Sequence, residues 1–252
     1  MVEIFILSIV QGITEFLPIS SSSHLILITK YFDFSNQQLS IDVALHVGSF
    51  MAGIVFFRND MLIFLKNKSL LLKFVVASIP VLVVGFFLIK YDLVRYLRNV
   101  EIIGWTTLIF GILLYVSDKF KKRNTLKNNF SIKIAILIGL MQILSLVPGV
   151  SRSGITITGA RFLSFKRYDS AKISFLLSVP TLAIISLYGI KNLVESNDFK
   201  FSFIILFSIL FSYLFSYFTI KYFLKYIKKF SLNIFVFYRI ILGSIILISV
   251  YL

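Results

Sequence analysis

The segment Gln11 to His24 reads QGITEFLPISSSSH and places a carboxylate, four consecutive serines and a histidine in an otherwise apolar stretch. Gln11 and Glu15 are four residues apart, so on a helix they share one face. Carboxylate, hydroxyl and imidazole groups are the components of nucleophilic and general acid–base catalysis. Serines alone commonly cap membrane helices or hold them together. Glu15 and His24 favour the catalytic interpretation, because ionisable groups at membrane depth are costly and indicate function.

A second polar segment, Gln142 to Thr158, reads QILSLVPGVSRSGITIT and is also surrounded by apolar runs. Its centre is Arg152, accompanied by hydroxyls and by glycines that allow close backbone approach: Ser151, Ser153, Thr156, Gly149 and Gly154. An arginine fork with hydroxyls at a helix start is a good receptor for a phosphate group. The alternative is a structural ion pair between Arg152 and Glu15. We predict that the two segments form one site.

The composition places these segments in a membrane protein. Hydrophobic residues make up 58% of the 252 residues and the mean hydropathy is +0.93, whereas soluble domains are about 45–50% apolar. Several apolar runs reach the roughly 20 residues that cross a bilayer as a helix. The formal charge of +15 resides in short loops between these runs, which indicates membrane topology and anionic headgroups rather than nucleic acid. The N-terminus lacks the pattern of a cleaved signal peptide and is expected in the mature fold.

The order of elements predicts six transmembrane helices and two re-entrant helical hairpins in one all-α membrane domain, residues 1–252. Each polar segment is interrupted by a proline, and its two short arms suit a re-entrant hairpin lining protein or a wet cavity. The spans are expected at Ser40–Phe57, Leu70–Ile89, Glu101–Ser117, Asp169–Ile190, Phe201–Tyr222 and Asn233–Leu252.

Matching residues recur at a nearly constant offset in the two halves. Gln142 follows Gln11 by 131 residues, and Ser151 follows Ser20 by the same number. We therefore predict an internal duplication, with repeat one at 1–117, a basic connecting loop at 118–130 and repeat two at 131–252. Three crossings per half make the two repeats inverted, so the hairpins enter from opposite faces and meet near the midplane.

The basic residues then divide unequally between the two faces. Fifteen fall on one face: Arg58, Lys66, Lys68, Lys119, Lys121, Lys122, Arg123, Lys127, Arg161, Lys166, Arg167, Lys221, Lys225, Lys228 and Lys229. Six fall on the other: Lys30, Lys90, Arg95, Arg98, Lys191 and Lys200. The positive-inside tendency assigns the fifteen to the cytoplasm, so both termini lie outside and the site is expected to open outward.

Other polar residues in the spans leave alternatives open. Asp42 and His46 are four apart and either face the site or lie at the interface. Arg239, in the last span, is expected to snorkel or to act as a structural partner. There is no cysteine, no zinc-type motif and no Walker loop in the sequence.

QGITE followed by FLPISSSSH, and then PGVSRSGIT, resemble the two signatures of the bacterial undecaprenyl-diphosphate phosphatases of the bacitracin-resistance type. The resemblance covers the whole chain in length and element order. It implies a multi-pass enzyme of the bacterial cell membrane that removes the terminal phosphate of the C55 isoprenyl diphosphate. The monophosphate product is the carrier for cell-wall (peptidoglycan) synthesis. The resemblance also implies a divalent cation, Mg²⁺ or Ca²⁺, and a homodimer is compatible with it.

Carried onto this sequence, the resemblance assigns catalytic roles to Glu15, Ser21 and His24, with Ser21 as nucleophile. It assigns phosphate binding to Arg152, with Ser151 and Thr156 beside it. From their positions in the two segments, Ser153, Ser20 and Ser22 are expected to bind phosphate as well. Glu15 and Gln11 would contribute to the cation, whose other oxygen ligands the diphosphate would supply. Ser23 stands where a glycine commonly precedes the histidine, and Gln11 leaves Glu15 as the only carboxylate of the first signature.

The sequence leaves four alternatives open. His24 rather than Ser21 could be the nucleophile, or a water could attack directly. Inverted repeats with broken helices are also the architecture of transporters, so a lipid-phosphate flippase would use the same features. A scaffold whose polar residues only join helices would show no turnover.

Overall fold

The computed structural model describes residues 2–32, 38–120, 122–195 and 203–252. Lys121, Lys200 and Phe201, which the charge count and one predicted span include, lie outside these ranges. The elements are helical, apart from an isolated bridge between Asn124 and Phe165. They are α1 (Val2–Thr14), α2 (Ser21–Phe32), α3 (Gln38–Phe56), α4 (Arg58–Lys66), α5 (Lys68–Lys90), α6 (Val94–Leu97), α7 (Val100–Asp118), α8 (Leu126–Asn129), α9 (Ile132–Gln142), η1 (Ile143–Leu146), α10 (Arg152–Phe162), α11 (Arg167–Glu195), α12 (Phe203–Ile227) and α13 (Asn233–Tyr251).

The long helices confirm an all-helical integral membrane protein. Five are long and apolar enough to cross a bilayer: α5, α7, α11, α12 and α13. A sixth candidate span is the pair α3 and α4, whose axes bend by 72° at a short break. The span predicted at Ser40–Phe57 corresponds to α3. The chain turns at its end, at Phe57, which directly precedes α4 and makes no side-chain cap hydrogen bond.

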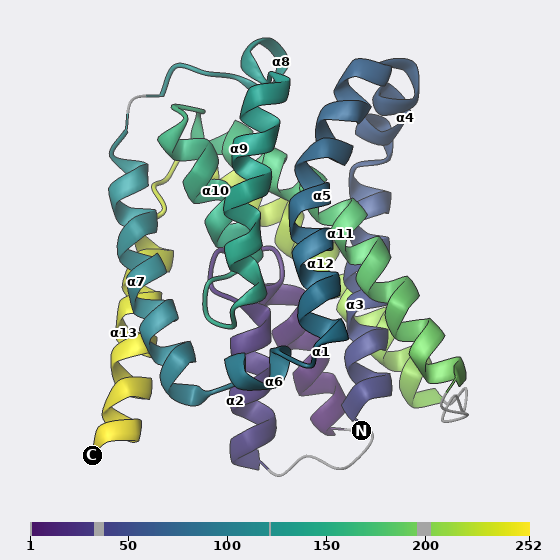
Figure 1. Cartoon of the computed structure of the whole chain (residues 1–252), viewed down its shortest axis with the longest axis vertical. Coiled ribbons are helices and arrows are strands. Elements are labelled where there is room, and N and C mark those ends of the chain that lie inside the picture. The colour runs from purple at the N-terminus through teal and green to yellow at the C-terminus, as the bar shows by residue number, and fades with distance from the viewer. Residues whose placement is uncertain (1, 33–37, 121, 196–202) are drawn as a thin grey trace.

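Two hairpins of shorter helices reach the middle of the molecule. The first hairpin consists of α1, the turn 15–20 and α2; the second consists of α9, η1, the turn 147–151 and α10. They enter from opposite ends, and the first comes from the end that holds both termini (Figure 1). Pro18 and Pro148 lie in the turns, where the helical hydrogen-bond pattern has already ended. The division into two repeats stays a prediction, and the opposed hairpins are the arrangement it requires.

Close helix contacts hold this arrangement together. α3 packs along α12, α1 also packs on α12, and α9 packs on α5. Glycine permits two of these approaches, since a Cβ on Gly48 would overlap the carbonyl of Ile209 and one on Gly139 would overlap that of Ala77. Such contacts between small residues are typical of helix packing in membranes.

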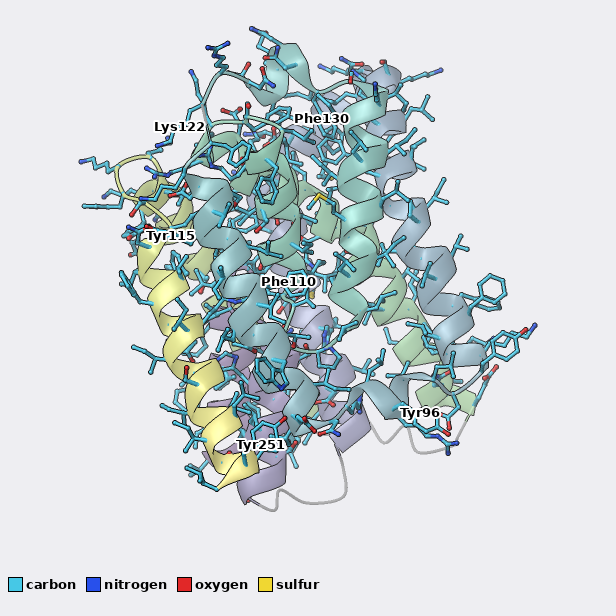
Figure 2. All side chains as sticks on the ribbon, turned by 60° about the vertical axis from the view of Figure 1, so that its left-hand side comes forward. Tyr96, Phe110, Tyr115, Lys122, Phe130 and Tyr251 are labelled. Carbon is cyan, nitrogen blue, oxygen red and sulfur yellow. The ribbon has the colours of Figure 1, made fainter. Side chains whose placement is uncertain are left out.

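The two ends of the molecule differ in their polar residues. Figure 2 shows Tyr96 and Tyr251 at the end that holds the C-terminus, and Lys122 toward the opposite end. Two residues of the charge count, Arg161 and Arg167, are not free surface charges. Both pair with the buried carboxylate of Asp118, at 3.2 Å and 2.6 Å, and so tie α10 and the start of α11 to the end of α7.

Candidate active site

Glu15 is the centre of the polar cluster between the hairpin turns. Its Oε2 accepts hydrogen bonds from the Ser21 hydroxyl at 2.6 Å and from Gln11 Nε2 at 3.1 Å. Its Oε1 accepts from Arg152 Nη2 at 2.9 Å. The Glu15 side chain is 7% exposed and that of Arg152 is 13% exposed. The structure thus brings together the turn of the first hairpin, the start of α2 and the start of α10.

The backbone presents these groups by the same device in both hairpins. Ser20 and Ser151 have positive φ angles of 75° and 70°, and each directly precedes the first residue of a helix. This left-handed conformation is unfavourable for a residue with a Cβ, and it often marks functional sites. It turns Ser21 and Arg152, the first residues of α2 and α10, toward Glu15. The positive ends of both helix dipoles therefore lie at the turns.

His24 is held by a separate pair of contacts. Its Nδ1 lies 2.6 Å from the Ser20 carbonyl, which only accepts hydrogen bonds, so Nδ1 is the donor. Its Nε2 lies 2.5 Å from the Tyr238 hydroxyl, and the two rings are stacked with centroids 5.7 Å apart. Glu15, for its part, is bonded to Ser21, Gln11 and Arg152. Tyr238 could not be identified from the sequence, because one tyrosine in an apolar span carries no motif.

Two buried polar atoms of the cluster have unused bonding capacity. Within the described residues, neither Arg152 Nη1 nor Gln11 Oε1 has a hydrogen-bond partner. Buried polar groups are almost always bonded, and leaving one unpaired costs about 1–3 kcal/mol. Nη1 requires an acceptor such as a phosphate oxygen, and Oε1 requires a donor or a cation. An anionic ligand would therefore satisfy Arg152 Nη1, and a donor or a bound cation would satisfy Gln11 Oε1.

The other predicted phosphate-binding hydroxyls make structural bonds in this state. Ser151 Oγ accepts from the Gly154 N–H at 3.0 Å and caps α10. Ser153 Oγ donates to the Leu17 carbonyl at 2.7 Å, which joins the two turns directly.

Thr156 is fully buried and bonds to the Arg152 carbonyl and to Ser174. Ser20 contacts the hydroxyls of Ser22 and Ser23, at 3.2 Å and 3.0 Å. Of the predicted site residues, Ser21, Gln11 and Arg152 are thus the ones that contact Glu15, and the remaining hydroxyls support the turns.

Arg239 lies behind both turns and is fully buried. It does not snorkel, because its guanidinium donates to five backbone carbonyls: Pro18, Gly149, Val150, Thr106 and Thr107. The expected structural role is therefore the observed one. The Arg239 guanidinium also adds a fixed positive charge close to the cluster.

Asp42 and His46 share a helical face, as predicted, with His46 Nδ1 2.8 Å from the Asp42 carbonyl. His46 is near enough to Glu15 for electrostatic interaction.

Few side chains could bind a divalent cation, but those present offer oxygen ligands. Gln11 Oε1 and the Glu15 carboxylate are the hard oxygen ligands that Mg²⁺ and Ca²⁺ prefer. Nowhere in the described ranges do three or more His, Asp or Glu side chains gather as a metal-binding group. Gln11 and Glu15 could hold a cation only if the substrate and water supplied most of its ligands.

The sequence profile of the family described as Bacitracin resistance protein BacA matches residues 4–245. An undecaprenyl-diphosphatase of Pelagibacter ubique (strain HTCC1062) is 50% identical over 251 residues, which cover 99% of this chain and 98% of the relative. An undecaprenyl-diphosphatase of Jannaschia sp. (strain CCS1) is 36% identical and covers 98% of each chain. One from Ruegeria sp. (strain TM1040) is 42% identical over 72% of this chain and 73% of its own. With signatures, element order and site geometry in agreement, this chain belongs to the bacitracin resistance protein BacA family.

Proposed function

We propose that this chain is a membrane phosphatase that hydrolyses undecaprenyl diphosphate to undecaprenyl phosphate and phosphate. That reaction would recycle the lipid carrier for cell-wall synthesis and give resistance to bacitracin. The relatives carry the name undecaprenyl-diphosphatase. The observation that carries the proposal is the contact of Ser21 and Arg152 with one buried carboxylate, Glu15. Because the relatives are named as hydrolases, we favour hydrolysis over lipid-phosphate transport.

In the proposed mechanism the substrate phosphate replaces Glu15 as the partner of the Arg152 guanidinium. Phosphate oxygens accept from Arg152, including the unpartnered Nη1, and the released carboxylate becomes free to accept a proton. Ser21 Oγ then attacks the terminal phosphorus, its proton passes to Glu15, and the bond from phosphorus to the bridging oxygen breaks. Undecaprenyl phosphate leaves and phosphoserine remains. Charge neutralisation and positioning supply most of the rate in phosphoryl transfer.

Water completes the cycle by attacking the phosphoserine: its hydroxyl joins the phosphorus and its other proton leaves through His24 to solvent. Glu15 returns its proton to Ser21 Oγ as the serine–phosphorus bond breaks, and phosphate is released. His24 exchanges protons with the leaving oxygen or with this water, and the Ser20 carbonyl and Tyr238 fix its ring. A divalent cation, when bound, would neutralise charge on the diphosphate, and Gln11 and Glu15 are the side chains that would hold it.

Trapping the covalent adduct distinguishes Ser21 from the other candidate nucleophiles. Substrate labelled in its terminal phosphate is mixed with enzyme, the reaction is quenched within one turnover, and the labelled peptide is mapped. We expect label on Ser21. Label on His24 would exchange the two roles, and an unlabelled protein that still turns over would favour direct attack by water.

The activity itself is tested by phosphate release in detergent. Purified protein should release phosphate from a long-chain isoprenyl diphosphate, and a chelator should reduce the rate if a divalent cation takes part. Glu15→Ala should abolish release while the protein still unfolds cooperatively on heating. Full phosphate release by folded Glu15→Ala would exclude the site described above.

We also propose that the end of the molecule bearing α4 and α8 faces the cytoplasm and that both termini and the site opening face outward. The support is the excess of Lys and Arg at that end and the common location of both termini at the other (Figure 1). A reporter fused after Leu252 should be active only in its extracytoplasmic form. A cytoplasmic reporter signal would reverse the orientation.

A further inference from the structure

A hollow lined by lysines is formed by α11, α12 and the start of α4. α4 lies at the end of the molecule away from the termini (Figure 1). Its volume is about 240 Å³, and α12 contributes Lys221, Lys225 and Lys228 to its wall. These positions are separated by four and three residues, so their side chains share one face of the helix. α11 adds Lys172 to the lining. The hollow belongs neither to the hairpin turns nor to the Glu15 cluster.

The charge balance in this hollow is strongly positive. The carboxylate that lines it, Asp60, is paired with Lys172 at 2.7 Å, and both side chains are about one quarter exposed. Within the described part of the chain, the three α12 lysines have no acidic partner. Lys221 and Lys228 rest over the rings of Tyr222 and Tyr168, at 6.0 Å and 4.7 Å from the centroids. Three exposed lysines without an acidic partner among the described residues therefore line the hollow.

The rest of the wall also favours an anion. Phe57 lines the hollow and precedes α4, whose first turn has no side-chain cap. The first N–H groups of a helix attract negative charge. Lysines near the C-terminal end of α12 also interact favourably with the helix dipole, so they would not by themselves indicate a ligand. What distinguishes this set is its convergence with Lys172, three aromatic residues (Phe56, Phe57 and Tyr168) and a helix start on one concave surface.

The size and position of the hollow identify the kind of anion. Drug-sized ligands occupy pockets of about 300–1,000 Å³, so 240 Å³ suits a phosphate-bearing headgroup rather than a larger molecule. α12 continues from the hollow into the apolar part of the molecule with exposed Phe218 and Tyr222 side chains. Acyl chains attached to the headgroup could lie along such a surface. Basic pockets between transmembrane helices bind anionic lipid headgroups.

We propose that this hollow is a binding site for the phosphate headgroup of an anionic phospholipid such as phosphatidylglycerol. Lys225 and Lys228 contact the phosphate, and Lys172, held by Asp60, completes the lining. The site is separate from the phosphatase cluster, so the proposal stands or falls independently of the proposed function.

Lipid binding to the full-length protein in detergent, followed by native mass spectrometry, tests the proposal. The probes are phosphatidylglycerol, phosphatidylcholine of the same chain length, and inorganic phosphate. A lysine that contacts an anionic headgroup contributes roughly a fivefold change in affinity, so Lys225→Ala/Lys228→Ala should weaken phosphatidylglycerol binding about 25-fold. The matched control is Lys66→Ala/Lys68→Ala, which removes the same charge from exposed positions on α4 and α5 and should change the affinity less than twofold.

Two further measurements keep the result interpretable. Phosphate release by Lys225→Ala/Lys228→Ala should match that of the unmodified protein, which shows that this variant is folded. Arg152→Ala should bind phosphatidylglycerol as tightly as the unmodified protein. This result would show that the measured binding does not occur at the hairpin turns. Equal binding of the two lipids, or equal losses in both double variants, would overturn the proposal. Inorganic phosphate that binds at the lysines as tightly as phosphatidylglycerol would overturn its assignment to a lipid.

Discussion

The two hairpin turns share a backbone geometry and differ in chemistry. Both reach their second helix through a serine with positive φ, Ser20 at 75° and Ser151 at 70°. The next residue is Ser21 in one and Arg152 in the other. The first hairpin carries the groups that can transfer protons and attack phosphorus, whereas the second carries the positive charge. Neither is complete alone, because the buried Glu15 of the first depends on Arg152 of the second.

This difference indicates how a symmetric framework can hold an asymmetric reaction. Phosphoryl transfer needs a nucleophile on one side of the phosphorus and charge neutralisation around it. Opposed hairpins supply these two requirements from opposite directions. The substitutions below test whether the roles are divided in this way.

Ser21→Ala should have the largest effect, because it removes the proposed nucleophile. Loss of a nucleophile commonly lowers kcat by roughly 10⁴-fold or more, and the same is expected for phosphate release here. Ser22→Ala is the matched control, since Ser22 is exposed and, among the described residues, its hydroxyl bonds to that of Ser20 and not to Glu15. Equal rates for the two variants would remove Ser21 from the reaction.

Arg152→Ala should lower kcat/KM by roughly 10³-fold, since an arginine that neutralises transition-state charge contributes about that much. Arg152→Lys keeps the charge but not the planar fork, so an intermediate rate is expected. Steady-state phosphate release gives both values, and thermal unfolding of each variant shows whether it is folded. Near-normal activity of Arg152→Ala would mean that the second hairpin has only a structural role.

Tyr238→Phe should lower kcat by roughly tenfold, less than the loss of a general acid–base group itself. The ring stays stacked on His24 but loses the hydroxyl that contacts Nε2. If Tyr238 positions His24, the pH profile of kcat should shift along with the rate. A rate change with an unmoved pH profile would indicate that the tyrosine acts through packing alone.

Glycine substitutions at the two positive-φ serines should have the smallest effects. Glycine adopts this conformation without strain, which is worth about 1 kcal/mol. Ser20→Gly should raise the free energy of unfolding by about that amount. Ser151→Gly should gain a few tenths of a kcal/mol less, because it also removes the cap of α10. Thermal or denaturant unfolding in detergent measures both, and a loss of stability in both variants would show that the hydroxyls outweigh the strain.

The sequence predicted the helices and the encounter of the two turns well, because apolar run lengths and broken segments are local signals. The Glu15–Arg152 ion pair was named as the structural alternative to phosphate binding, and the structure contains that pair.

Contacts across helices could not be predicted in the same way. Thr156 and Ser151 belong to the signature, yet their hydroxyls face neighbouring backbone and side chains. Tyr238 and Arg239 lie in an apolar span, and only the packing of α13 shows that one contacts His24 and the other binds both turns. Spacing reveals which residues share a helical face, but not what lies opposite that face.

The central claim is that the two hairpins act as one site, and a double-mutant cycle in the rate of phosphate release tests it most directly. The rates of Ser21→Ala, Arg152→Ala and the double variant are compared with that of the unmodified enzyme. Residues that act as a unit are strongly non-additive, so the double variant should be little slower than the slower single variant. A double variant whose loss equals the product of the two single losses would show that the hairpins act independently and would contradict this account.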